Sequence, residues 1–120
     1  MKKKVLVADD EIHILNLIKL TLGDEYEFIE AMDGIEVLNK LEHSTPDIIL
    51  MDVMMPKMDG FNALKKIKQN PKTKDIPVIL ISAKDEDQDV LYGIDLGAAA
   101  YVAKPFNKQD LSEMIKNLIG

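Results

Sequence analysis

Two hydrophobic periods alternate along this chain of 120 residues. Short runs of consecutive apolar and partly β-branched residues, such as 78–81, have the pattern of strands that are covered on both faces. Between these runs, apolar residues recur every three or four positions, as they do on the inward face of a helix. The first such series is Ile12, Leu15, Ile18 and Leu22, and Gly23 follows where a C-terminal glycine cap belongs.

The alternation predicts five strands, each followed by a helix. The expected strands are residues 5–8, 27–31, 47–51, 77–81 and 99–103. The expected helices are residues 11–22, 33–41, 60–68, 85–96 and 107–119. Parallel strands need covering crossovers, which are right-handed, so this order predicts a parallel sheet with helices on both faces. The fold class is therefore α/β, doubly wound.

Polar residues follow four of the apolar runs. They are Asp9 and Asp10 after the first, Asp52 after the third, Ser82 after the fourth and Lys104 after the fifth. The carboxyl ends of parallel strands lie along one edge of a sheet. We therefore expect three carboxylates, a hydroxyl and an ammonium group to meet in one crevice.

Length and composition limit what surrounds this crevice. A chain of 120 residues suits one domain, residues 1–120, and leaves no room for a second. A content of 47% hydrophobic and 30% charged residues is typical of an ordinary globular protein. The absence of cysteine excludes disulfides, thiolate catalysis and cysteine-ligated metals.

The charge balance bears on the partners. The net charge is −6, and all 15 basic residues are lysine. Nucleic-acid binding favours a positive face, and base recognition relies heavily on arginine, so we expect no direct contact with nucleic acid. Proteins or small phosphorylated molecules are the expected partners.

The N-terminal residues do not predict a signal peptide. Three lysines, Lys2 to Lys4, precede an apolar run that stops at Asp9, which is too short for a signal sequence. No apolar stretch approaches the ~20 residues needed to cross a bilayer. We therefore expect a cytoplasmic protein that does not associate with membranes.

The loops at the crevice exclude two common ligands of α/β sheets. A dinucleotide site would need G-x-G-x-x-G after the first strand, and a nucleoside triphosphate site would need G-x-x-x-x-G-K-[ST]. Neither motif occurs, and the first loop offers carboxylates in place of glycines.

The carboxylates indicate a metal site instead. Asp9, Asp10 and Asp52 would repel one another unless a cation lay among them. Ligands that are all oxygen favour Mg²⁺ over Zn²⁺, and Lys104 would bring the local charge close to balance. Taken alone, each residue has a simpler explanation: the acidic pair as a helix N-cap, Asp52 as a turn residue and Lys104 as a surface lysine. Because all of these residues follow strands that end at the same edge of the sheet, the metal site is the favoured interpretation.

Several separated motifs together resemble a known family, the receiver domain of two-component response regulators. The motifs are Asp9-Asp10, Asp52 followed by Met55-Pro56 and Asp59-Gly60, Ser82-Ala83, and Lys104-Pro105-Phe106. They occur in the order and at the spacing of the family, and the resemblance covers the whole chain. It implies a flavodoxin-like sheet with strand order 2-1-3-4-5, and a cis peptide bond between Lys104 and Pro105.

The resemblance also implies a role for each site residue. Asp52 would accept a phosphoryl group from a phosphohistidine. Asp10, Asp52 and the backbone carbonyl of Met54 would bind Mg²⁺ directly, and Asp9 would bind it through a water molecule. Lys104 and Ser82 would each contact a phosphoryl oxygen.

In the family, arrival of the phosphoryl group moves the hydroxyl residue, here Ser82, and turns inward an aromatic residue of the fifth strand, here Tyr101. The surface of the fourth helix, fifth strand and fifth helix changes as a result. A half-buried strand aromatic is an equally good interpretation of Tyr101. Met54 and Lys84 correspond to variable positions beside the path of the hydrolytic water.

The leading hypothesis is thus a signalling switch, not an enzyme, that stands alone as a receiver. Its expected partners are a sensor histidine kinase or phosphotransfer protein and a downstream protein target. One alternative is the receiver of a longer regulator. Another is an aspartyl-phosphate phosphatase, although that class usually carries a cap and two aspartates separated by one residue. A third, an interaction module without the chemistry, is disfavoured because every site residue is present.

Overall fold

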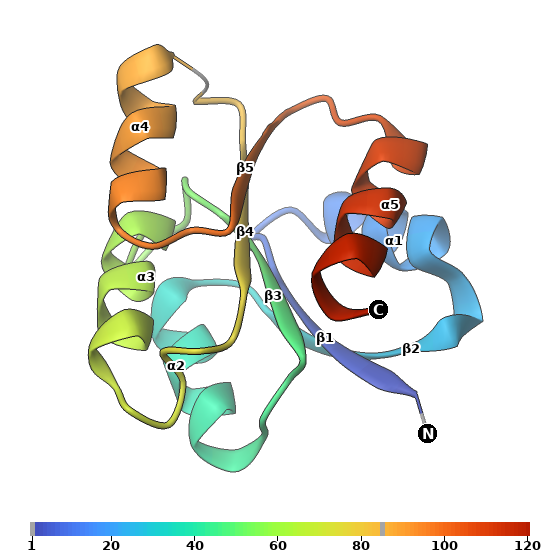
Figure 1. Ribbon diagram of the computed structural model, residues 1–120, viewed down its shortest axis with the longest axis horizontal. Helices are drawn as coiled ribbons and strands as arrows, with labels where there is room; N and C mark the ends of the chain where they lie inside the picture. The colour runs from blue at the N-terminus through green and yellow to red at the C-terminus, as the bar shows by residue number, and fades with distance from the viewer. Residues whose placement is uncertain (1, 85) are drawn as a thin grey trace.

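The five strands form one parallel sheet in the order β2-β1-β3-β4-β5 in a computed structural model, which describes residues 2–84 and 86–120 (Figure 1). The order and the parallel pairing confirm the predicted fold class. The strands are β1 (Lys3–Ala8), β2 (Tyr26–Ala31), β3 (Ile48–Asp52), β4 (Val78–Ser82) and β5 (Ala100–Ala103).

A helix follows each strand, and the helices cover both faces of the sheet (Figure 1). They are α1 (Ile12–Leu22), α2 (Gly34–His43), α3 (Gly60–Gln69), α4 (Asp87–Asp95) and α5 (Lys108–Ile119), with a short 3₁₀ turn, η1 (Gly23–Glu25), after α1. Gly23 has φ 74° and its N–H donates to the carbonyl of Lys19, so it caps α1 as predicted. The predicted start of the fourth helix at Asp85 lies outside the described residues.

Two hydrophobic cores explain why the strands are apolar without a break. Successive residues of a strand point to opposite faces of the sheet. Leu6, Ile49 and Leu80 therefore belong to a core beneath α2 and α3. Their neighbours Val7 and Leu50 belong to a second core beneath α1 and α5. Both faces are dry, so both sets of strand positions have to be apolar.

The predicted inward face of α1 needs correction at its first turn, and the first apolar residue of α2 is exposed in the same way. Ile12 is 61% exposed, whereas Leu15, Ile18 and Leu22 are buried. Ile35 in α2 is 42% exposed, and the fully buried residue of this helix is Val37. Both isoleucines lie in the first turn, where the helix leaves the loop at the edge of the sheet. Helical spacing alone does not show where the underlying core ends.

No helix in the described part of the chain is long and apolar enough to span a bilayer.

Candidate functional site

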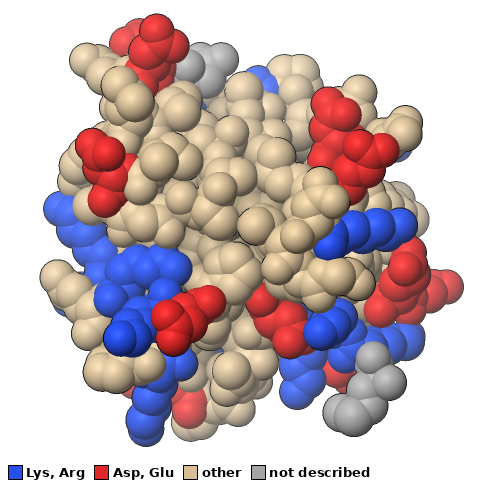
Figure 2. All heavy atoms as spheres, viewed as in Figure 1, with Lys and Arg blue, Asp and Glu red and all other residues tan. Residues whose placement is uncertain are grey.

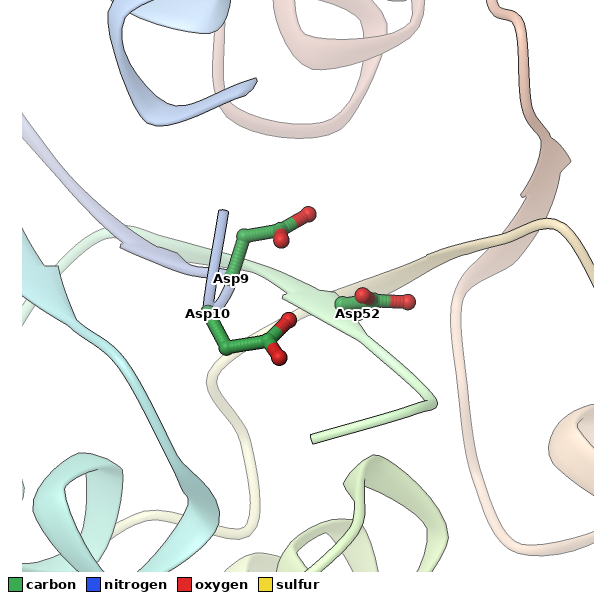
Figure 3. Close-up of side chains that lie close together, drawn as sticks. All are labelled: Asp9, Asp10 and Asp52. Carbon is green, nitrogen blue, oxygen red and sulfur yellow. The ribbon is translucent and has the colours of Figure 1, made fainter. Parts of the chain in front are cut away.

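The three aspartates meet at the carboxyl edge of β1 and β3. One carboxylate oxygen each from Asp9, Asp10 and Asp52 lies within 4.8 Å of the others. Figure 3 shows the three side chains around a common space. Asp9 and Asp52 are buried and Asp10 is exposed, so the cluster opens to solvent on one side. The structure thus brings these predicted site residues together.

Lys104 reaches the same cluster from the end of β5. Its Nζ donates to Oδ2 of Asp9 at 2.8 Å and to Oδ2 of Asp52 at 3.2 Å. Its backbone N–H donates to the carbonyl of Ser82 at 2.9 Å, which fixes it beside the end of β4. The Lys104–Pro105 peptide bond is cis, as the family resemblance implied.

Backbone groups hold the two buried carboxylates in place. Asp9 Oδ1 accepts a hydrogen bond from the N–H of Glu11 at 2.9 Å. Asp52 Oδ1 accepts one from the N–H of Met54 at 3.3 Å. Glu11 is the N-cap of α1 and makes no side-chain capping bond, so Asp9 supplies an acceptor at this helix start. Neither Asp9 nor Asp10 is therefore the N-cap residue of α1, although Asp9 accepts from the N–H of that residue.

Helix α3 begins in direct contact with the end of β3. The N–H of Gly60 donates to the carbonyl of Val53 at 2.8 Å. A Cβ at position 60 would lie 2.4 Å from the backbone oxygen of Asp52, so only glycine fits. Asp59 caps the helix by accepting from the N–H of Asn62 at 2.8 Å. Asp59-Gly60 is one of the motifs that carry the family resemblance. The close approach of α3 to the backbone of Asp52 explains why glycine is required there.

The loop between β3 and α3 is also tied to α2. The N–H of Gly34 donates to the carbonyl of Met58 at 3.0 Å. A Cβ at position 34 would lie 2.4 Å from that same carbonyl oxygen. The sequence predicts only a helix start at Asp33-Gly34, because a contact with a loop more than twenty residues away leaves no local pattern.

The residues at the end of β4 make a second set of contacts. Ser82 is fully buried, and its Oγ accepts from the N–H of Lys84 at 3.0 Å. The Tyr101 hydroxyl donates to the carbonyl of Lys84. The Lys84 ammonium lies 3.5 Å from Oδ1 of Asp89 in α4. Lys84 thus contacts Ser82, Tyr101 and α4, and the pairing with Asp89 was not predicted.

The charges of the cluster shift two pKa values. Burial, together with the nearby charge of Asp9, raises the pKa of Asp52 above its usual range, although Lys104 opposes the change. Burial alone would lower the pKa of Lys104, but its hydrogen bond to Asp9 and the charges of Asp52 and Asp9 together raise it. Lys104 therefore stays charged and offsets one of the three formal carboxylate charges, which leaves a formal excess of two negative charges.

The donor set fits a hard divalent cation. All three candidate ligands are carboxylates, and an excess of two negative charges is what one divalent ion would neutralise. Exposed Asp10 leaves room for water ligands, which Mg²⁺ usually keeps. His13 is not part of the cluster: it lies 3.3 Å from Glu11, and its side chain is 74% exposed. The acidic pocket could therefore hold a metal ion.

The comparison with known protein families agrees with this geometry. Residues 5–116 match the family model described as the response regulator receiver domain. The chain belongs to this family. It is therefore a receiver domain of the kind found in two-component systems, with the five-stranded fold that those domains share.

Individual relatives and structures support the assignment. The receiver domain is 39% identical over 120 residues to the alkaline phosphatase synthesis transcriptional regulatory protein PhoP of Bacillus subtilis, covering 99% of this chain and 49% of PhoP. It matches the receiver domain of the Francisella response regulator 1452 with a TM-score of 0.91 and 33% identity, covering 98% of this chain and 97% of that one.

A third match bears on the acidic pocket. The receiver domain of sensor histidine kinase PA1611 from Pseudomonas aeruginosa has a TM-score of 0.91 and 26% identity, covering 100% of this chain and 99% of that one. Its structure has a magnesium ion coordinated in the active-site cleft. The chain described here spans about half the length of the first curated relatives that it matches.

Proposed function

We propose that this receiver domain accepts a phosphoryl group on Asp52 from the phosphohistidine of a sensor kinase or phosphotransfer protein. The observation that carries the proposal is the position of Asp52. The residue is 4% exposed, and its carboxylate lies in a cluster with those of Asp9 and Asp10 and accepts a hydrogen bond from Lys104. In the reaction an oxygen of Asp52 attacks phosphorus, the P–N bond breaks, and the imidazole leaves and takes up a proton.

Mg²⁺ is the proposed cofactor, and Asp10, Asp52 and the Met54 carbonyl would hold it, with Asp9 contributing through a water molecule. When bound, it supplies neutralising charge for the transferred group. The chain's own residues do the positioning. The N–H of Met54 orients the Asp52 carboxylate, and Lys104, already 3.2 Å from Asp52, is placed to pair with a phosphoryl oxygen.

Ser82 and Tyr101 are the proposed switch. The Ser82 Oγ already accepts from Lys84, and its hydroxyl proton is still available to a phosphoryl oxygen. A shift of Ser82 would move Lys84, whose carbonyl accepts from Tyr101. The surface formed by α4, β5 and α5 would then change and alter the affinity for a downstream protein.

The protein acts as a switch, not as an enzyme on external substrates, and works in the cytoplasm without binding nucleic acid or membranes itself. Relatives such as PhoP are transcriptional regulators about twice as long as this chain. The receiver therefore acts either by itself or as the input domain of a longer regulator.

Incubation with acetyl phosphate and Mg²⁺, followed by intact-protein mass spectrometry, tests the proposal. We expect a gain of one phosphoryl group in the parent protein, and none in Asp52→Asn or in the parent without divalent cation. Asp47→Asn is a matched control. Asp47 also lies beside a strand, but its carboxylate is outside the cluster and accepts from the N–H of Lys4. Equal labelling of Asp52→Asn and parent would refute the assignment.

A further inference from the structure

The lysines of this acidic protein are unevenly distributed. Six of the 15 lie between residues 57 and 74, and Asp59 is the one carboxylate in that segment. The segment has a net charge of +5, and the remainder of the chain therefore carries −11. Figure 2 shows lysine side chains gathered at the lower left, over α3 and the loop that follows it. The site described above does not use this charge.

The lysines border two adjoining hollows that share Lys66. The first has a volume of about 330 Å³ and is lined by Lys57, Lys65 and Lys66 together with Met58, Asn62 and Gln69. The second, of about 420 Å³, includes Lys66, Lys72 and two partly buried leucines, Leu38 and Leu41. We call the two hollows together the α3 groove. Among its described lining residues, Glu42 in the second hollow is the one carboxylate.

Some of these lysines already have partners. The ammonium of Lys68 donates to the carbonyls of Lys74 and Ile76 at 2.9 and 3.0 Å, which holds the loop after α3. Lys65 lies over the ring of Tyr92, 5.7 Å from its centroid.

The lysines along the groove are less engaged. Lys57 is 3.7 Å from Asp33 and its side chain is 72% exposed, so the pair is weak. Lys66 and Lys72 are exposed, and their ammonium groups have no ion pair or hydrogen bond within the described residues. Three of the four lysines that line the groove, Lys57, Lys66 and Lys72, are thus available to an external anion.

We propose that the α3 groove docks an acidic segment of another protein that also carries an apolar side chain. Its carboxylates would pair with Lys57, Lys66 and Lys72, and its apolar side chain would pack on Leu38 and Leu41. Helix α3 has ten residues and is about 15 Å long, which suits a short segment. The proposal concerns a surface separate from Asp52 and does not depend on phosphorylation.

The same observations argue against other anionic partners. A long nucleic acid would extend beyond α3 onto a molecule whose remaining residues carry a net charge of −11. The described lining also lacks an aromatic side chain on which a base could stack. A bilayer surface is flat and would leave the leucines of the second hollow without contact.

Fluorescence anisotropy with a labelled 12-residue peptide tests the proposal. The probe carries a glutamate at every third or fourth position and one central leucine. We expect binding that tightens as salt is lowered and that weakens about tenfold in Lys57→Glu/Lys66→Glu/Lys72→Glu, since each exposed pair contributes a modest amount. The control Lys2→Glu/Lys108→Glu/Lys116→Glu changes three exposed lysines elsewhere by the same total charge and should weaken binding less than threefold.

Further variants and probes distinguish an acidic peptide from a nucleic acid or a lipid surface as the partner of the α3 groove. A peptide with serine in place of leucine should bind several-fold more weakly, and Asp52→Asn should bind as the parent does. Lys57→Ala/Lys66→Ala/Lys72→Ala should show a smaller loss in the same direction, with an unchanged circular dichroism spectrum. Equal losses in the groove and control variants would overturn the proposal. So would tighter binding of a 12-nucleotide single strand, or of phosphatidylglycerol vesicles, than of the peptide.

Discussion

Helices α3 and α4 each follow a strand that ends in a site residue, yet they are attached very differently. Helix α3 buries five of its ten residues, and the side chain of Asp59 caps it. Helix α4 buries only Gly93, and its N-cap, Glu86, makes no side-chain capping bond. Its exposed side chains include Leu91, Tyr92 and Ile94.

The two sides of the crevice therefore differ in how firmly the helix that follows each strand is held. The side of the crevice that holds Asp52 is anchored, because the backbone of α3 touches the backbone of β3 at Gly60. The side that holds Ser82 leads to a helix with little buried surface, which can move at small cost in free energy. A site that accepts a group on one side and reports it on the other would need this arrangement. Four measurements test the comparison.

The largest expected effect is that of adding a methyl group at the start of α3. In Gly60→Ala the new Cβ would meet the carbonyl oxygen and carbon of Asp52 and the Cα of Val53, none of which can rotate away. We expect a loss of roughly 3 kcal/mol in the free energy of unfolding, measured by urea denaturation. In Gly93→Ala of α4 the obstacles are side chains, those of Leu80 and Tyr101, at 2.9 to 3.3 Å.

That second variant should lose less than about 1 kcal/mol, because side chains can shift and alanine is the better helix former. Equal losses in Gly60→Ala and Gly93→Ala would contradict the claim that α3 is the more firmly anchored helix.

The second effect is a pH dependence confined to the Asp52 side. The pKa of Asp52 is raised above its ordinary value of 3.8 in the folded protein, so the folded state binds its proton more tightly than the unfolded state does. Its contribution to stability therefore falls as pH rises from 3.8 through the raised pKa, and the full cost is present at neutral pH.

In metal-free buffer at pH 7, Asp52→Asn should therefore be more stable than the parent, by roughly 1 kcal/mol. The gain should shrink as pH approaches 3.8. Ser82→Ala is the control from the β4 side, and its stability difference should not depend on pH in this window. A gain for Asp52→Asn that is constant between pH 7 and pH 4 would show that the carboxylate is not destabilised by its surroundings.

The third effect is the loss of a helix cap. Asp59→Ala removes the acceptor for the N–H of Asn62 and should cost about 1 kcal/mol. Glu86→Ala at the same position of α4 removes no capping bond and should change the free energy of unfolding by less than about 0.5 kcal/mol. Thermal denaturation of both variants measures the two losses. A larger loss of stability in Glu86→Ala than in Asp59→Ala would contradict the claim that α3 is the better capped helix.

The smallest effect concerns the lifetime of the proposed aspartyl phosphate. Met54 is 60% exposed and lines a hollow of about 670 Å³ between α3 and α4. Its apolar side chain should hinder the approach of a hydrolytic water. We expect Met54→Asn to lose the phosphoryl group about threefold faster, which is roughly 0.6 kcal/mol in the barrier. Decay in the parent that is as fast as in the variant, followed by mass spectrometry, would contradict this.

Most of the architecture was available from the sequence because the sheet is buried on both faces. The run of residues 78–81 has to be apolar because both of its faces are covered, so the strand could be recognised without its neighbours. That the polar residues at the ends of the strands would lie close together followed from the parallel order of the strands. Asp9, Asp52 and Lys104 do meet, as the common sheet edge predicted.

Contacts between segments far apart in the sequence were harder to predict. The requirement for glycine at position 60 depends on how closely α3 approaches β3, and no local pattern encodes that distance. The Lys84–Asp89 pair was hidden in an acidic run that suits any helix start. The loop after α3 is rich in polar residues, as surface loops are, but it buries Thr73, whose hydroxyl donates to the carbonyl of Ile67 at 2.6 Å.

The contacts of Lys84 have a consequence for how such a domain could diversify. Its N–H serves Ser82 and its carbonyl serves Tyr101, so the link between these two residues runs through backbone atoms. Every residue except proline offers both groups. The side chain at position 84 can therefore be exchanged while the connection between Ser82 and Tyr101 is preserved.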